Sequence, residues 1–245
     1  MTAVLETPRV TLVLLPGLDG TDAFFAPLLA HLPAWIEPLV VTYPGMGPNS
    51  YEDLLPRVLD AVPTSDRFAV LGWSFGGPLA LRVAHQRSTS VTAVVLCSSF
   101  VTAPKPALAP LRAGVRTPVV WALRTARRVG LWLRADVSPD LRRAKALTWQ
   151  RVGARTLAAR SRAALGVDAR PELVACTAPL MYLVASEDTV ISRRALGEVV
   201  RLAPRTRVSE VDGPHLALFT NPGACAERIA DFLAGAPGVA RDGDR

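Results

Sequence analysis

Short apolar runs that alternate with longer helical patterns constrain the fold of this 245-residue sequence most strongly. Each run has the length of a buried strand, and turn-forming residues separate it from the next helical pattern. We expect strands at 10–15, 36–42, 67–72, 91–97, 179–185 and 206–211. We expect helices near 22–32, 52–62, 75–86, 192–202 and 222–233. This alternation predicts an α/β fold with a mostly parallel central sheet flanked by helices.

The alternation stops after Cys97 for about eighty residues, which is far longer than an ordinary connecting loop. The interrupting sequence is rich in Ala, Arg, Leu and Trp, a composition that favours helices. We therefore expect an inserted helical cap over 103–170. The core would consist of 1–102 and 171–235, followed by a frayed tail at 236–245.

Positive charge is concentrated in this cap. The whole chain has a formal net charge of +7, but residues 103–170 contain 15 Lys and Arg against three acidic residues, a net +12. On a helical wheel, four arginines fall within about one third of the circumference: Arg124, Arg127, Arg128 and Arg134. The apolar residues Val129, Trp132 and Leu133 lie opposite them. A second basic face would hold Arg151, Arg155 and Arg162. The arginines form either a solvated helix surface or a landing site for an acidic partner.

Other sequence features are those of an ordinary cytoplasmic protein. The first ten residues, MTAVLETPRV, contain no basic leader followed by a long apolar stretch, so we expect no signal peptide. The apolar run VTLVLL is too short to span a membrane. Cys97, Cys176 and Cys225 lie far apart, so we expect buried or half-buried free thiols. Neither metal-ligand spacing nor a dinucleotide-binding fingerprint is present, and we expect no cofactor and no metal.

A single serine stands on a predicted sharp turn, GWSFGG at 72–77, between a strand and a helix. The glycines lack a Cβ, which lets neighbouring backbone pack closely while Ser74 takes a tight, strained conformation at the tip. At the carboxyl end of a parallel strand, such a side chain projects into the crevice where ligands bind. The backbone N–H of Phe75 would point towards an anion there. The alternative is a structural glycine turn.

A serine hydroxyl needs a base before it becomes a good nucleophile, and the chain contains only three histidines. His31 and His85 fall at the ends of predicted surface helices, where we expect solvated or packing roles. His215 follows the last predicted strand, in a loop containing Gly213 and Pro214 that can bring an imidazole back over the sheet. His215 is therefore the candidate base.

The G-x-S-x-G sequence between a strand and a helix resembles the nucleophile elbow of the α/β-hydrolase superfamily. This resemblance implies an acid after the fifth predicted strand, in SEDTVIS, and the order Ser74, Asp188, His215 matches the family's order. It favours Asp188 over the neighbouring Glu187. A helix-capping role for this SED cluster is the alternative.

The same resemblance implies an oxyanion hole. The loop LPGLDGT after the first strand is similar to the family's oxyanion loop, with Pro16 in place of a common histidine. The donors would be the backbone N–H groups of Leu18 and Phe75. Asp19 and Asp22 either hold this loop by hydrogen bonds or act as turn residues, and the turn role is favoured.

The implied activity is that of a serine carboxylesterase. Aromatic residues near the crevice fit an apolar acyl or alkyl group, and we expect Trp73 and Phe100 to contact substrate. Phe24 and Phe25 follow the oxyanion loop, and we expect one or the other of them to be a core residue. GWSFGG with an arginine-bearing cap is also similar to the pimeloyl-acyl-carrier-protein methyl ester esterases, which read GWSLGG, whereas PGLDGTDAFF is closer to other bacterial hydrolases.

Several alternatives remain open at this point. The enzyme could be a thioesterase, an acyltransferase or a methyl esterase acting on acyl groups linked to an acidic carrier protein that docks on Arg124, Arg127 and Arg128. It could be a lipase at an anionic membrane surface. A noncatalytic scaffold would have no need for an exposed serine on a strained turn. The expected partners do not include nucleic acid.

Overall fold

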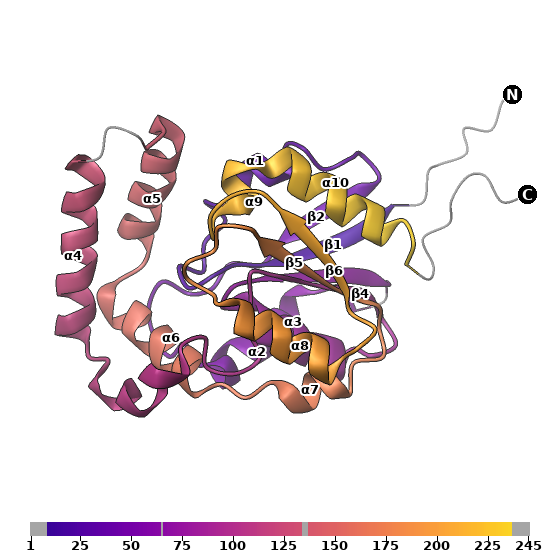
Figure 1. Ribbon diagram of the computed structural model, residues 1–245, viewed down its shortest axis with the longest axis horizontal. Helices are drawn as coiled ribbons and strands as arrows, with labels where there is room; N and C mark the ends of the chain where they lie inside the picture. Colours follow the sequence, from indigo (N-terminus) through magenta and orange to yellow (C-terminus); the bar gives the residue numbers. More distant parts are fainter. Residues whose placement is uncertain (1–8, 65, 134–136, 237–245) are drawn as a thin grey trace, which may run out of the picture.

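Six parallel strands form one sheet at the centre of the protein (Figure 1). The computed structural model describes residues 9–64, 66–133 and 137–236. The sheet order is β2-β1-β3-β4-β5-β6, and every neighbouring pair is parallel. The strands are β1 (Val10–Leu15), β2 (Ile36–Val40), β3 (Phe68–Trp73), β4 (Val91–Cys97), β5 (Leu180–Ala185) and β6 (Arg207–Val211). All six expected strands and the α/β fold are confirmed.

Helices cover both faces of the sheet and bury its apolar side chains in two clusters. One face packs against α2 (Tyr51–Ala61), α3 (Gly76–Gln86), α7 (Arg170–Val174) and α8 (Arg193–Leu202). The other face packs against α1 (Ala26–Leu29), α9 (Ala217–Thr220) and α10 (Pro222–Leu233). β3, β4 and β5 are buried along their whole length, as apolar strands of a two-sided parallel sheet must be.

The first helix differs from expectation. The helix expected at 22–32 is reduced to α1, because residues before Phe25 form turns in which the Phe25 N–H donates to the Asp22 carbonyl. Asp22 does not cap this helix through its side chain. Its carboxylate instead pairs with Arg151 at 2.6 Å.

The strand order places two loops opposite each other. After β1 the chain moves outwards to β2, then returns to β3 on the other side of β1. The loops that follow β1 and β3 consequently flank a topological switch point, where ligands of open α/β sheets bind. These two loops are 16–21 and the turn at Ser74.

The residues expected to form the cap are largely helical. They contain the 3₁₀ helix η1 (Pro106–Gly114), α4 (Thr117–Leu133), α5 (Pro139–Arg151) and α6 (Ala154–Gly166). In Figure 1, α4 and α5 stand at the left of the sheet, and α6 lies nearer the core. An antiparallel bridge between Thr102 and Asp168 brings the two ends of this segment together.

The second predicted basic face of the cap is not one helix surface. Arg151 is the last residue of α5, and Arg155 belongs to α6. Val152 and Gly153 lie between them in extended conformation, so the helical wheel does not continue across the break. Arg162 of α6 donates to the Val115 carbonyl at 2.8 Å.

All three cysteines are free thiols, as predicted: Cys97 and Cys225 are buried and Cys176 is half-buried. Among the helices of the described residues, none is long and apolar enough to cross a membrane. Residues 237–245 of the predicted tail lie outside the described residues. So does Arg134 of the first predicted basic face.

Candidate active site

The turn after β3 presents Ser74 in a strained conformation. Ser74 has a φ of 52°, in the left-handed region that residues other than glycine seldom adopt. Close contacts around this turn explain the glycines at positions 72 and 77 of GWSFGG. A Cβ on Gly72 would lie 2.4 Å from the Gly76 carbonyl oxygen, and one on Gly77 would lie 1.8 Å from Ser99 Oγ. Glycine is therefore required for the close strand-to-helix approach.

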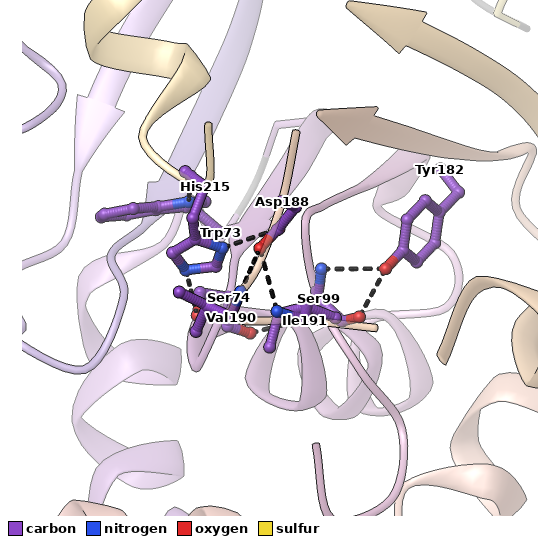
Figure 2. A network of polar contacts seen from close by, with 8 residues as sticks. All are labelled: Trp73, Ser74, Ser99, Tyr182, Asp188, Val190, Ile191 and His215. Atoms are coloured by element: carbon purple, nitrogen blue, oxygen red, sulfur yellow. Dashed lines mark hydrogen bonds and ion pairs between the residues drawn. The ribbon is translucent and has the colours of Figure 1, made fainter. Parts of the chain in front are cut away.

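A continuous row of hydrogen bonds joins the three predicted site residues (Figure 2). Ser74 Oγ lies 3.0 Å from His215 Nε2, and His215 Nδ1 lies 2.8 Å from Asp188 Oδ2. The side chains of His215 and Asp188 are largely buried. Because each ring nitrogen faces a different partner, a proton on Nδ1 is held by the carboxylate, while Nε2 is left to accept the serine proton.

Asp188 is held in the ionised form suited to this arrangement. Its second oxygen, Oδ1, accepts the backbone N–H groups of Val190 at 2.8 Å and Ile191 at 2.9 Å. Burial acts to raise the pKa of Asp188, but these hydrogen bonds and the interaction with His215 outweigh it and lower the pKa below its ordinary value. The neighbouring Glu187 is exposed to solvent.

Further contacts fix the backbone on both sides of the row. Ser99 Oγ donates to the Ser74 carbonyl at 2.7 Å, and the Tyr182 hydroxyl donates to the Ser99 carbonyl (Figure 2). The Trp73 indole N–H donates to the His215 carbonyl at 3.3 Å. The sequence did not single out Ser99 or Tyr182, and it assigned Trp73 a different role, because nothing in the local sequence reports a contact across 83 or 142 residues.

The two predicted oxyanion donors lie on the loops that flank the switch point. The Ser74 carbonyl accepts from Ser99 Oγ and from the Gly77 N–H, so the Phe75 N–H of the same trans peptide points the other way. The Leu18 N–H belongs to the loop after β1. Within the described residues, neither of these two N–H groups has a hydrogen-bond acceptor.

The aromatic residues predicted to contact substrate do not form an open mouth. Trp73 is 4% exposed and packs edge-on against Phe24 and Phe25, while Phe100 is 2% exposed within the opposite core cluster. The turn that directs Ser74 Oγ towards His215 directs the side chain of Trp73 into the core. The predicted substrate-binding roles of Trp73 and Phe100 are therefore corrected to packing and, for Trp73, support of His215. Phe24 and Phe25 are both core residues, although only one of them was expected to be.

The other two histidines and the arginines of the predicted docking surface lie elsewhere. His31 and His85 are exposed surface residues. Arg124 is turned into the cap, where its guanidinium donates to the carbonyls of Val152 and Trp149. Its predicted place on a docking surface is thus corrected: the helix packs through this arginine. Arg127 and Arg128 are exposed.

Together, the parallel sheet and the serine–histidine–carboxylate row at its carboxyl edge define a hydrolase of the α/β class. The chain belongs to the alpha/beta hydrolase family, whose model matches residues 12–228. It is an enzyme of that family. The superfamily resemblance seen in the elbow sequence is confirmed.

Known relatives extend this comparison. The chain is 38% identical over 102 residues to the polyketide synthase ThaQ of Burkholderia thailandensis, covering 38% of this chain and 5% of ThaQ. It is 31% identical over 239 residues to the AMB antimetabolite synthetase AmbE of Pseudomonas aeruginosa, covering 92% of this chain and 10% of AmbE. The chain thus spans a small fraction of these curated relatives. The enol-lactonase of Burkholderia xenovorans has the same fold, with a TM-score of 0.75, 21% identity and 92% of each chain covered.

Proposed function

We propose that this protein is a serine hydrolase that cleaves carboxylic esters through an acyl-enzyme. The observation that carries the proposal is the unbroken row from Ser74 Oγ through the His215 ring to the Asp188 carboxylate. Ser74 is the nucleophile, His215 is the general base, and Asp188 orients the ring and stabilises its charged form. The sheet and its loops hold all three side chains within hydrogen-bond distance of one another.

The reaction follows from these contacts. Ser74 Oγ attacks the ester carbonyl carbon as its proton moves to His215 Nε2. When the tetrahedral intermediate collapses, the bond to the leaving alcohol breaks, and His215 gives its proton to that alcohol. Water then attacks the acyl-enzyme with His215 again as base, and the acid and free Ser74 are released. Asp188 remains ionised throughout.

The negative oxygen of both intermediates needs donors that are already in place. The unengaged N–H groups of Leu18 and Phe75 are suited to this role, since they come from the two loops that flank the switch point. Each such donor is worth about 10²- to 10³-fold in rate in enzymes of this chemistry.

The proposal is tested by hydrolysis of chromogenic esters with acyl chains from about two to sixteen carbons. Wild type and Ser74→Ala are compared at equal concentrations of folded protein. Turnover that disappears in Ser74→Ala supports the proposal and also gives the preferred chain length. Turnover that persists in Ser74→Ala overturns it.

A second candidate substrate class is an acyl group linked to an acidic carrier protein, as a thioester or ester. Two observations favour it. One curated relative is a polyketide synthase by name, and polyketides are built from acyl units. The cap also carries a net charge of +12, and α4 exposes both charged and apolar groups: Arg127, Arg128, Trp121 at 62% and Leu123 at 59%.

Such a surface could alternatively contact an anionic membrane, where the exposed apolar side chains would insert. Salt distinguishes the two. Binding to an acidic protein through exposed arginines weakens strongly as salt rises, because these charges are screened. Binding to anionic vesicles that persists at about 1 M salt, where screening acts within a few ångströms, would favour the lipase alternative.

A further inference from the structure

An arginine of the cap is completely buried against the loop after β1. Arg160 lies on α6 and has 0% of its surface exposed. Its guanidinium carries five N–H donors, and the structure contains five acceptor contacts. Nη1 donates to the carbonyls of Leu18 at 3.0 Å and Asp19 at 2.6 Å. The other contacts go to the Pro44 carbonyl at 2.9 Å and to Asn49 Oδ1 at 2.8 and 3.0 Å.

These contacts complete the fixation of the loop at 16–20. The Tyr43 hydroxyl donates to the Pro16 carbonyl at 3.1 Å, and the Gly20 N–H donates to the Gly17 carbonyl at 2.9 Å. The Gly20 carbonyl accepts the Tyr43 N–H at 2.8 Å. With Arg160 on the Leu18 and Asp19 carbonyls, every carbonyl of the loop has a donor.

The direction of the carbonyls decides the direction of the candidate donor. In a trans peptide the C=O and N–H point to opposite sides. The Gly17 carbonyl is held within the loop, so the Leu18 N–H of the same peptide faces away from that contact. The next peptide contains the Leu18 carbonyl, which Arg160 holds. Rotation of the Gly17–Leu18 peptide would place the Gly17 carbonyl where the Leu18 N–H now points, and Arg160 restrains this rotation by holding the adjoining Leu18 carbonyl.

The fit around the guanidinium is close. A Cβ on Gly20, which has φ of +68°, would lie 2.3 Å from Arg160 Nη1. The Tyr43 ring lies 5.3 Å from the guanidinium carbon, within cation–π range. Burial lowers the pKa of Arg160 to about 10, partly offset by Tyr43 and Asp19, so the group remains charged at neutral pH. An ionised group is buried only where such contacts compensate for lost hydration.

We propose that Arg160 is a positioning residue that holds the oxyanion loop in its donating conformation and makes the Leu18 N–H donor depend on the cap being seated on the core. The inference rests on the proposed function, because it assigns a support to the oxyanion hole. Other cap contacts hold different segments: Arg151 pairs with Asp22, and Thr156 donates to the Gly45 carbonyl.

The test compares Arg160→Gln, Arg160→Lys and the matched control Arg162→Gln, which lies on the same helix and bonds only within the cap in the contacts described. For each, kcat and KM are measured on the preferred chromogenic ester. Affinity is measured for a trifluoromethyl ketone, which forms an oxyanion on Ser74, and for an unreactive ether of the same shape.

The expected result is a split between transition-state and ground-state binding. Arg160→Gln should lower kcat by about 10²-fold, the effect of losing one oxyanion donor, with little change in KM. Ketone affinity should fall by a similar factor and ether affinity should not. Arg160→Lys should recover part of the loss, and Arg162→Gln should match wild type.

Several outcomes would overturn the inference. A folded Arg160→Gln variant with wild-type kcat removes the positioning role, and equal losses of ketone and ether affinity would make Arg160 merely structural. If Arg160 variants do not fold, Asn49→Ala, which removes two of the five contacts, must show the same split in smaller measure, or the inference fails. A wild type that turns over no ester or carrier-linked acyl group overturns the proposed function and this inference together.

Discussion

His215 Nε2 lies 3.0 Å from Ser74 Oγ, although the two residues are 141 positions apart in the sequence. Because of this contact, we expect that neither side chain alone is sufficient for ester hydrolysis. Ser74→Ala and His215→Ala should each lower kcat for ester hydrolysis by at least about 10⁴-fold, because the nucleophile and its base act as a unit. Initial rates on the chromogenic ester series check this, with circular dichroism to confirm folding. A double variant should be hardly worse than either single one.

The two adjacent carboxylates after β5 should differ sharply. Asp188→Asn removes the charge that orients and stabilises the His215 ring and should lower kcat by about 10⁴-fold. Glu187→Gln is its matched control, since that side chain is exposed and should leave kcat within about threefold of wild type. Equal losses in both variants would overturn the assignment of Asp188.

Asp188 should also make stability depend on acid pH. Its pKa is lower in the folded protein than its ordinary value of 3.8. The unfolded chain therefore binds the proton first, so the stabilisation is fully present above that ordinary value and is lost as pH falls through the folded pKa. Urea unfolding of wild type and Asp188→Asn should show a stability difference that is constant from about pH 7 to 5 and changes below about pH 4, to the disadvantage of wild type. A difference independent of pH down to acid unfolding would contradict this.

The close approach at the elbow predicts a strong effect of one methyl group. Gly72→Ala should lower the free energy of unfolding by about 1–3 kcal/mol, because its Cβ would meet backbone atoms of Gly76 and Gly77 that cannot move aside. Gly197→Ala in α8 is the control, since its Cβ would have no contact within 4 Å in the described structure. It should stabilise the protein by about 0.5–1 kcal/mol through helix propensity. Urea denaturation measures both.

The exposed arginines of α4 provide the test of carrier docking. Replacing Arg127 and Arg128 together with Ala should raise KM for a carrier-linked acyl substrate about tenfold or more at low salt while leaving kcat/KM for a small free ester unchanged. Arg201→Ala, an exposed arginine of α8, should affect neither. Equal losses on both substrates would remove the docking role, and the effect should shrink as salt is added.

Much of the fold and the core of the site were predictable from the sequence for a physical reason. Buried parallel strands must be apolar along their whole length, so β3 and β4 stand out as continuous runs. The elbow requires small residues at fixed spacing, so GWSFGG marks Ser74. The small number of histidines then pointed to His215, and the resemblance to the α/β-hydrolase superfamily pointed to Asp188.

What the sequence missed depends on contacts between distant segments. A helical wheel does not show which arginine of the cap contacts the core. Arg160 could therefore not be distinguished from the other cap arginines, and Arg124 was assigned to the wrong surface. Trp73 and Phe100 were placed at the crevice because a sharp turn does not reveal which side chains it directs inwards. The helix expected at 22–32 is shortened to α1 because the residues before Phe25 form turns, in which the Phe25 N–H donates to the Asp22 carbonyl.

The distance in sequence between Ser74 and His215 also has a consequence during synthesis. The turn that carries the serine leaves the ribosome long before β6 and the His215 loop exist, and domains gain their native contacts as their segments become available. Until then the hydroxyl has no base beside it and reacts like any other alcohol. On the proposed function, a nascent chain therefore cannot hydrolyse esters through Ser74 until the chain as far as the His215 loop has been synthesised and has folded.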